Sequence, residues 1–113
     1  MVPKDAELWE KTHALYEKMR PLLCAADKEI ASDINSAMLS LLASISQAGV
    51  SKSCTEQKIF YTHALRLCAR IDSCLTIIER KGDKIPRSSL HEIHDEIDIM
   101  TENLEPLPVP FRV

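Results

Sequence analysis

The chain has 113 residues, of which 45% are hydrophobic, 27% are charged and only two are glycines. This length suits one domain with a modest core, and so few glycines argue against the many tight turns of an all-β fold. The net charge of −3 excludes a general attraction to nucleic acid, and the charged first ten residues lack the apolar run of a secretory signal peptide, so we expect a cytoplasmic protein.

Residues 3–20 form the first predicted helix. Proline suits the first turn of a helix and disrupts later turns, so we expect Pro3 to open this helix and Pro21 to end it. Residues spaced by three or four positions form its apolar seam, which consists of Leu8, Thr12, Leu15 and Met19.

The second predicted helix, residues 28–48, is followed by Gly49 and contains the most apolar stretch of the chain. It is too short and too rich in serine for a membrane span, so no membrane partner is expected. Serines at every fourth position form one stripe along it: Ser32, Ser36, Ser40 and Ser44. Two interpretations stay open: burial on nearly all sides, with Ser36, Ser40 and Ser44 at an oligomer interface, or a central helix with one solvated serine face.

A third helix is predicted to begin after Ser53, which forms a capping box with Glu56, and to end near residue 81. Its seam consists of Phe60, Ala64, Leu67, Ile71, Cys74 and Ile78. Pro86 opens a fourth helix, whose inward residues are Leu90, Ile93, Ile97, Met100 and Leu104. Four amphipathic helices with short connections predict an all-α fold, an antiparallel up-down-up-down four-helix bundle over residues 1–104.

Residues 105–113 form a separate, proline-rich tail in which prolines alternate with apolar residues. Such a sequence favours extended, polyproline-like chain. We expect its apolar side chains, Leu107, Val109 and Phe111, to contribute to the oligomer interface.

Charge is distributed unevenly over the second half of the chain. Basic residues gather around the connection between the third and fourth helices, whereas the fourth helix is acidic on its outer face. The segregation fits either a solvated surface or head-to-tail contact between copies of the chain. Any nucleic-acid binding should be weak, should fall steeply with salt, and should centre on Lys52, Arg66, Arg70, Arg80, Lys81, Lys84 and Arg87.

An alternative function is a metal-binding or enzymatic bundle that uses His91, His94 and Asp95 of the fourth helix together with Glu10. His91 with Asp95 and His94 with Asp98 are spaced four residues apart, as metal ligands or hydrogen-bond partners on one helix face would be. The four cysteines include no CxxC pair and are expected to be buried free thiols. No nucleotide-binding or hydrolase motif is present. We therefore expect neither an enzyme nor a bound metal or cofactor.

The helix order resembles a small bacterial four-helix-bundle family that includes proteins encoded in intervening sequences of large-subunit ribosomal RNA genes. Accessory variability proteins of diversity-generating retroelements belong to the same family. Four segments carry the likeness: residues 8–19, SAMLSLLASISQA, FYTHALRLCARIDSCLTII and DEIDIM.

The resemblance implies a non-enzymatic bundle that assembles into a ring, commonly a pentamer. In the retroelement branch it implies binding to a reverse transcriptase and to nucleic acid through a strongly basic surface. Here Asp33, Asp72 and Thr76 lie where basic residues are expected, so the fold and assembly carry over better than nucleic-acid binding. The sequence therefore predicts a homo-oligomeric scaffold or adaptor, with a reverse transcriptase and weakly bound RNA or DNA as further expected partners.

Overall fold

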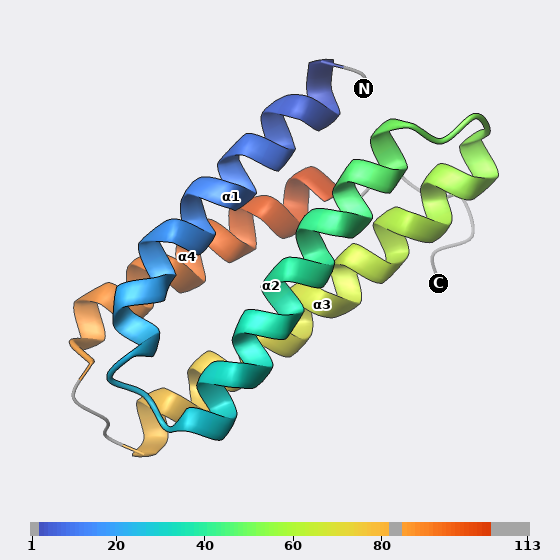
Figure 1. Cartoon of the computed structure of the whole chain (residues 1–113). Helices are drawn as coiled ribbons and strands as arrows, with labels where there is room; N and C mark the ends of the chain where they lie inside the picture. Colours follow the sequence, from blue (N-terminus) through green and yellow to red (C-terminus); the bar gives the residue numbers. More distant parts are fainter. Residues whose placement is uncertain (1–2, 82–84, 105–113) are drawn as a thin grey trace, which may run out of the picture.

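The computed structural model describes residues 3–81 and 85–104, and it contains the four predicted helices with no strand among these residues. The helices are α1 (Pro3–Leu23), α2 (Lys28–Gly49), α3 (Cys54–Lys81) and α4 (Arg87–Leu104). Each helix packs against the next one in the chain, and α4 packs back on α1. Figure 1 shows α2 between α1 and α3, with α4 beside α1. The prediction of an all-α, antiparallel four-helix bundle is confirmed.

The predicted apolar seams meet in one core, except that Phe60 of the predicted third-helix seam is only half-buried and lies outside this core. Met19, Ile34, Met38, Ile45 and Ile71 have no solvent-exposed surface. Thr12 is also fully buried, and its hydroxyl donates a hydrogen bond of 2.7 Å to the carbonyl of Leu8. The hydroxyl is therefore satisfied by its own helix and does not leave an unpaired polar group in the core.

Helix α1 continues past Pro21, so the prediction that this proline ends the helix is wrong. A proline removes one hydrogen bond to the carbonyl four residues back, and its ring crowds that carbonyl, but the residues after it can still continue the helix. In the last turn of a helix, the loss of one hydrogen bond costs little. Because the helix continues past Pro21, Leu23 lies buried in the core. The helix then ends in tight turns, with the amide of Ala26 donating to the carbonyl of Leu23 at 3.1 Å.

Two side chains cap the following helices. Asp27 accepts a hydrogen bond of 2.9 Å from the amide of Glu29 at the start of α2. At the start of α3, Ser53 Oγ accepts one of 3.1 Å from the amide of Glu56, as the capping sequence predicted. Both caps satisfy amides that have no partner inside their helix.

Helix α2 is not buried on all sides within one chain. Ser36, Leu39 and Ser40 are exposed, and Leu39 retains 50% of its surface. Ser44, in contrast, is buried. A bundle of four helices covers α2 only where α1 and α3 pack, so its remaining side lies open. Residues 105–113, including the predicted interface residues Leu107, Val109 and Phe111, lie outside the described residues.

Candidate interaction surface

The open side of α2 continues into a groove between α2 and the first half of α3. The groove is about 930 Å³ in volume. Small side chains of α2 line one wall, among them Ser40 and Ala43, and Ser44 lies buried below them. Ile59 and Phe60 of α3 line the other wall, and Ile59 is 62% exposed. Two of the three predicted interface serines, Ser40 and Ser44, therefore line one groove, and Ser36 is exposed one turn further along α2.

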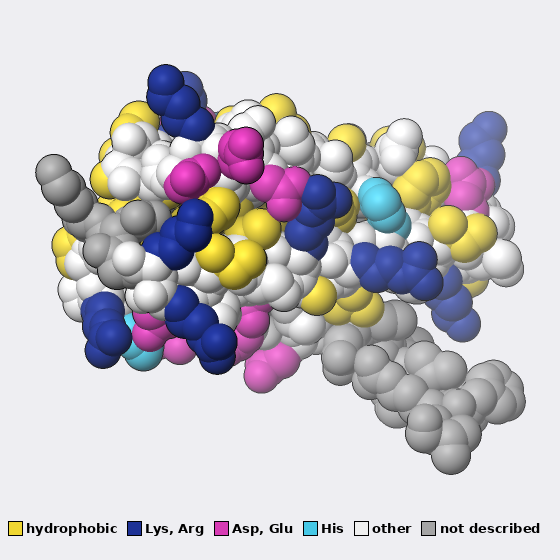
Figure 2. Space-filling view, turned by 90° about the horizontal axis from the view of Figure 1, so that it is seen from below, with side chains coloured by type: hydrophobic (Ala, Val, Ile, Leu, Met, Phe, Trp, Pro, Cys, Tyr) yellow, Lys and Arg dark blue, Asp and Glu magenta, His cyan; other side chains and the backbone are white. Residues whose placement is uncertain are grey.

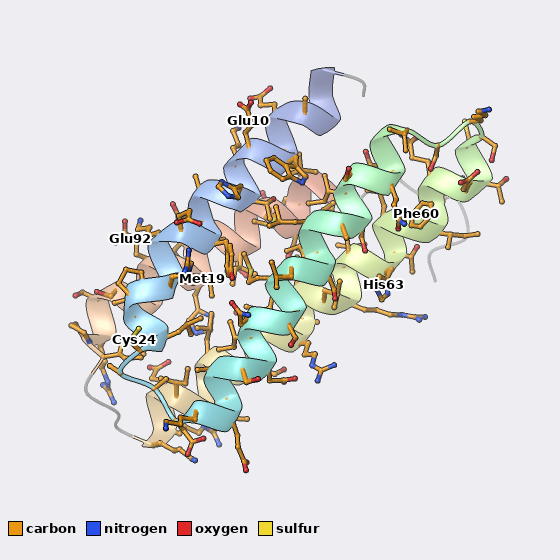
Figure 3. The ribbon with its side chains drawn as sticks, in the orientation of Figure 1. Glu10, Met19, Cys24, Phe60, His63 and Glu92 are labelled. Atoms are coloured by element: carbon orange, nitrogen blue, oxygen red, sulfur yellow. The ribbon has the colours of Figure 1, made fainter. Side chains whose placement is uncertain are left out.

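The α3 wall of this α2–α3 groove is basic. Lys58, His63 and Arg66 line it and are all exposed, and none of the described lining residues is acidic. Figure 2 shows Lys and Arg side chains exposed beside hydrophobic side chains on the face that it presents, and Figure 3 shows Phe60 and His63 on the same part of α3. An exposed surface that combines apolar and basic side chains suits a partner with both apolar and acidic groups.

The predicted nucleic-acid-binding residues do not form one patch. Arg66 lies in the α2–α3 groove and Lys52 is exposed in the turn beside it, whereas Arg80 and Arg87 are exposed at the opposite end of the bundle. Helix α3 has 28 residues and is about 42 Å long at 1.5 Å per residue, which separates its two ends. Lys84 lies outside the described residues.

Two further members of this set are held by carboxylates of the same chain. Arg70 forms an ion pair with Asp33 of α2, and Lys81 lies 3.7 Å from Asp27. The hydrogen bond from Arg70 is the main reason why the pKa of Asp33 lies below its usual value. At Asp27 the amide of Glu29 lowers the pKa most, with a smaller contribution from Lys81. Arg70 and Lys81 are already paired with carboxylates, which offset their positive charge. Their attraction for a phosphate is therefore weaker.

The histidines of α4 face α3 and not the aspartates of their own helix. His94 Nδ1 contacts Asp72 Oδ1 in a half-buried hydrogen bond. His91 Nε2 lies 3.9 Å from Glu79 Oε1. The pairings expected between residues four apart on this helix are thus replaced by contacts between two helices.

Glu10, the other residue of the metal hypothesis, is exposed on α1. Across residues 3–81 and 85–104, no group of three or more His, Cys, Asp or Glu side chains could hold a metal ion.

The prediction for the cysteines is half correct. Cys68 and Cys74 are buried in the core, but Cys24 and Cys54 are exposed, and all four are free. Burial raises the pKa of the Cys68 thiol to about 11. It also raises the pKa of Cys74, whose thiol additionally donates to Asp33 at 3.3 Å. Cys24 and Cys54 lie at helix ends, where the bundle does not cover them.

The sequence prediction did not include Lys58, Ile59 or His63 among the functional residues. Their spacing carries the missing signal, because Ile59, His63 and Arg66 follow one another by four and three positions and thus form one stripe. An isoleucine on a stripe that also carries a histidine and an arginine, about 100° around the helix from the apolar seam, indicates an exposed mixed surface.

Comparisons with known proteins establish the fold. No family model matches the sequence, and no curated protein matches it. The structure is similar to the crystal structure of a protein of unknown function from the S23 ribosomal protein family of Bacteroides thetaiotaomicron, with a TM-score of 0.78 and 17% identity. The match covers 89% of this chain and 94% of that chain. Among the described residues, none of the helices has the length and hydropathy needed to cross a membrane.

Proposed function

We propose that this chain is a non-enzymatic helical scaffold that forms homo-oligomers and acts as an adaptor for other macromolecules. The observation that supports the proposal is the α2–α3 groove, an open surface with small side chains on one wall and apolar and basic side chains on the other. Ser40 and Ala43 leave room for another helix to approach closely, because the distance between packed helices depends on the side chains at their contact.

Charge favours contact between unlike faces of neighbouring chains. The groove is basic, whereas the exposed side of α4 carries Glu92, Asp95, Asp98 and Glu102. An interface between two different faces is heterologous, and repeated heterologous contacts close into a ring when the rotation between copies permits. The resemblance to intervening-sequence and retroelement accessory proteins favours a pentamer among the possible rings.

Sedimentation velocity of Ser40→Glu tests where the chains meet. A glutamate at the exposed Ser40 places a charge and a long side chain in the groove, so we expect the variant to sediment as a smaller species than the wild type. Ser73→Glu is the matched control, since Ser73 is exposed on α3 and does not line the groove. Unchanged assembly in Ser40→Glu would place the interface elsewhere.

The finer proposal is that the assembled scaffold is the accessory partner of a retroelement reverse transcriptase and binds nucleic acid weakly. Arg80 and Arg87, exposed at the end of the bundle away from the groove, would contact phosphates, and a ring would bring several copies of them together. Fluorescence anisotropy with single-stranded RNA at several salt concentrations tests it. Arg80→Ala and Arg87→Ala each remove one cation per chain, so each should reduce the slope of log affinity against log salt by about 0.7 for every phosphate that this cation neutralises. Tight binding that does not change with salt would contradict the proposal.

A further inference from the structure

We infer that the α2–α3 groove binds the outer face of α4 from a second copy of this chain, with the two helices antiparallel and Ile99 opposite Ile59. The inference rests on the proposed homo-oligomer and adds which face enters the groove and in which direction it runs. Ile59 retains 62% of its surface and Ile99 retains 58%. A contact between them would remove exposed apolar surface from water on both copies at once.

The outer face of α4 is one stripe of exposed residues, spaced by three and four positions and consisting of Glu92, Asp95, Ile99 and Glu102. It lies on the opposite side of the helix from the buried residues of α4. Ile99 is therefore an apolar side chain with a carboxylate before it and another after it along the stripe. Within residues 3–81 and 85–104, neither Asp95 nor Glu102 forms an ion pair, whereas Glu92 pairs with Lys18.

The α3 wall of the groove carries the complementary stripe. His63 and Arg66 follow Ile59 by four and seven positions and are exposed. Neither of the two contacts a carboxylate in the part of the chain that the structure describes, whereas Arg70, the next residue of the stripe, is held by Asp33. The donors that are available to a carboxylate of another copy thus lie beside Ile59, inside the groove.

The spacing of the two stripes favours antiparallel helices. Four and seven residues before Ile99, the outer face of α4 carries carboxylates, at distances of about 6 and 10 Å along the helix. Four and seven residues after Ile59, the wall of the groove carries hydrogen-bond donors. Antiparallel helices bring these groups together in the pairs His63–Asp95 and Arg66–Glu92. Parallel helices would instead place Arg66 beyond the end of α4 at Leu104.

The ion pair of Glu92 within its own chain is compatible with this arrangement. Lys18 contacts Glu92 and also lies 3.6 Å from Glu96 Oε2. An ionised carboxylate has two oxygens with about four lone-pair sites, so Glu92 can accept from Lys18 and from Arg66 of another copy. Arg66 would therefore add a bond without breaking the one that joins α1 to α4.

Charge reversal across the interface tests the inference. His63→Glu and Asp95→Lys each place like charges opposite one another, so each should raise the concentration at which half of the protein is assembled by about tenfold or more. The double variant restores opposite charges and should assemble near the wild-type concentration. Glu102→Lys is the matched control for Asp95→Lys, because it makes the same change of charge on the same face, and it should not rescue His63→Glu.

The outcomes separate this inference from the proposed function. Rescue of His63→Glu by Glu102→Lys and not by Asp95→Lys would indicate parallel helices and overturn the inference. Weaker assembly in Ser40→Glu with no rescue in either double variant would overturn the inference but leave the homo-oligomeric scaffold supported. A wild type with the mass of one chain at every concentration would overturn both.

Disulfide trapping gives a second readout. In chains whose exposed Cys24 and Cys54 are replaced by serine, Ile59→Cys combined with Ile99→Cys should give a ladder of covalent oligomers on oxidation. Ile77→Cys with Ile99→Cys is the matched control, because Ile77 is exposed on α3 but does not line the groove, and it should not form the ladder. Equal trapping in the control would overturn the inference. Covalent dimers from Ile59→Cys alone would also overturn it, since like faces would then meet.

Discussion

Arg70 of α3 donates two hydrogen bonds to the carboxylate of Asp33 on α2, one of them from Nε to Oδ2 at 3.1 Å. The Cys74 thiol donates a third to the same oxygen. These bonds join the two helices that pack most extensively. They favour the ionised carboxylate, and the pKa of Asp33 is accordingly lower than the usual 3.8.

The first prediction is a loss of stability in acid that depends on Asp33. Because its pKa is lower in the folded than in the unfolded chain, its contribution is fully present above pH 3.8 and disappears as the pH falls through the lowered folded value. Urea unfolding at a series of pH values should show a smaller acid-dependent loss in Asp33→Asn than in the wild type. Asp98→Asn, on the exposed side of α4, should keep the wild-type profile, and identical profiles for all three proteins would contradict the prediction.

A second prediction concerns the reactivity of the four thiols. Cys24 and Cys54 are exposed, whereas Cys68 and Cys74 are buried and have raised pKa values. Since the thiolate is the nucleophile, iodoacetamide at neutral pH should label the first two rapidly and the last two only after denaturation. Peptide mass spectrometry over a time course measures the four rates. Rapid labelling of Cys68 in the native protein would show that the α3 side of the core is open.

The third prediction compares two isoleucines on α3. Ile71 is fully buried, whereas Ile77 is 45% exposed. Ile71→Ala should lower the free energy of unfolding by about 2–5 kcal/mol, because it removes buried methyl groups and leaves a cavity. Ile77→Ala, the matched control, should cost well under about 1 kcal/mol. Urea unfolding followed by circular dichroism measures both free energies. An equal loss of stability in the two variants would contradict the orientation of α3, in which Ile71 faces the core and Ile77 faces solvent.

The cap of α3 supplies a fourth prediction. Ser53 Oγ accepts the hydrogen bond of the Glu56 amide, so Ser53→Ala should lower the free energy of unfolding by about 0.5–2 kcal/mol. Ser53→Asp should restore most of this stability, since an aspartate accepts the same bond and also suits the positive end of the helix dipole. Ser53→Asp as unstable as Ser53→Ala would exclude capping as the cause.

The order of the helices and most of their apolar seams could be predicted because they depend on local sequence. Buried residues recur every three or four positions, so the pattern that includes Leu8, Leu15 and Met19 determines which face of α1 turns inward. The extension of α1 past Pro21 could not be predicted from propensity, because it depends on the burial of Leu23 in the assembled bundle.

Contacts between helices were less predictable. Whether Arg70 meets Asp33, or His94 meets Asp72, depends on the rotation of each helix and on its shift along the bundle axis. Sequence spacing fixes neither quantity between helices. The predicted pairing of His94 with Asp98 used spacing along one helix, whereas in the structure packing turns His94 toward α3.

The mass of the assembled protein in solution tests the central proposal most directly. One chain has a mass of 12.8 kDa. Multi-angle light scattering of the wild type across micromolar concentrations should give a multiple of this mass, with five chains favoured, and Ser40→Glu should reduce it. A mass of one chain at every concentration would contradict the proposal that this bundle is a homo-oligomeric scaffold.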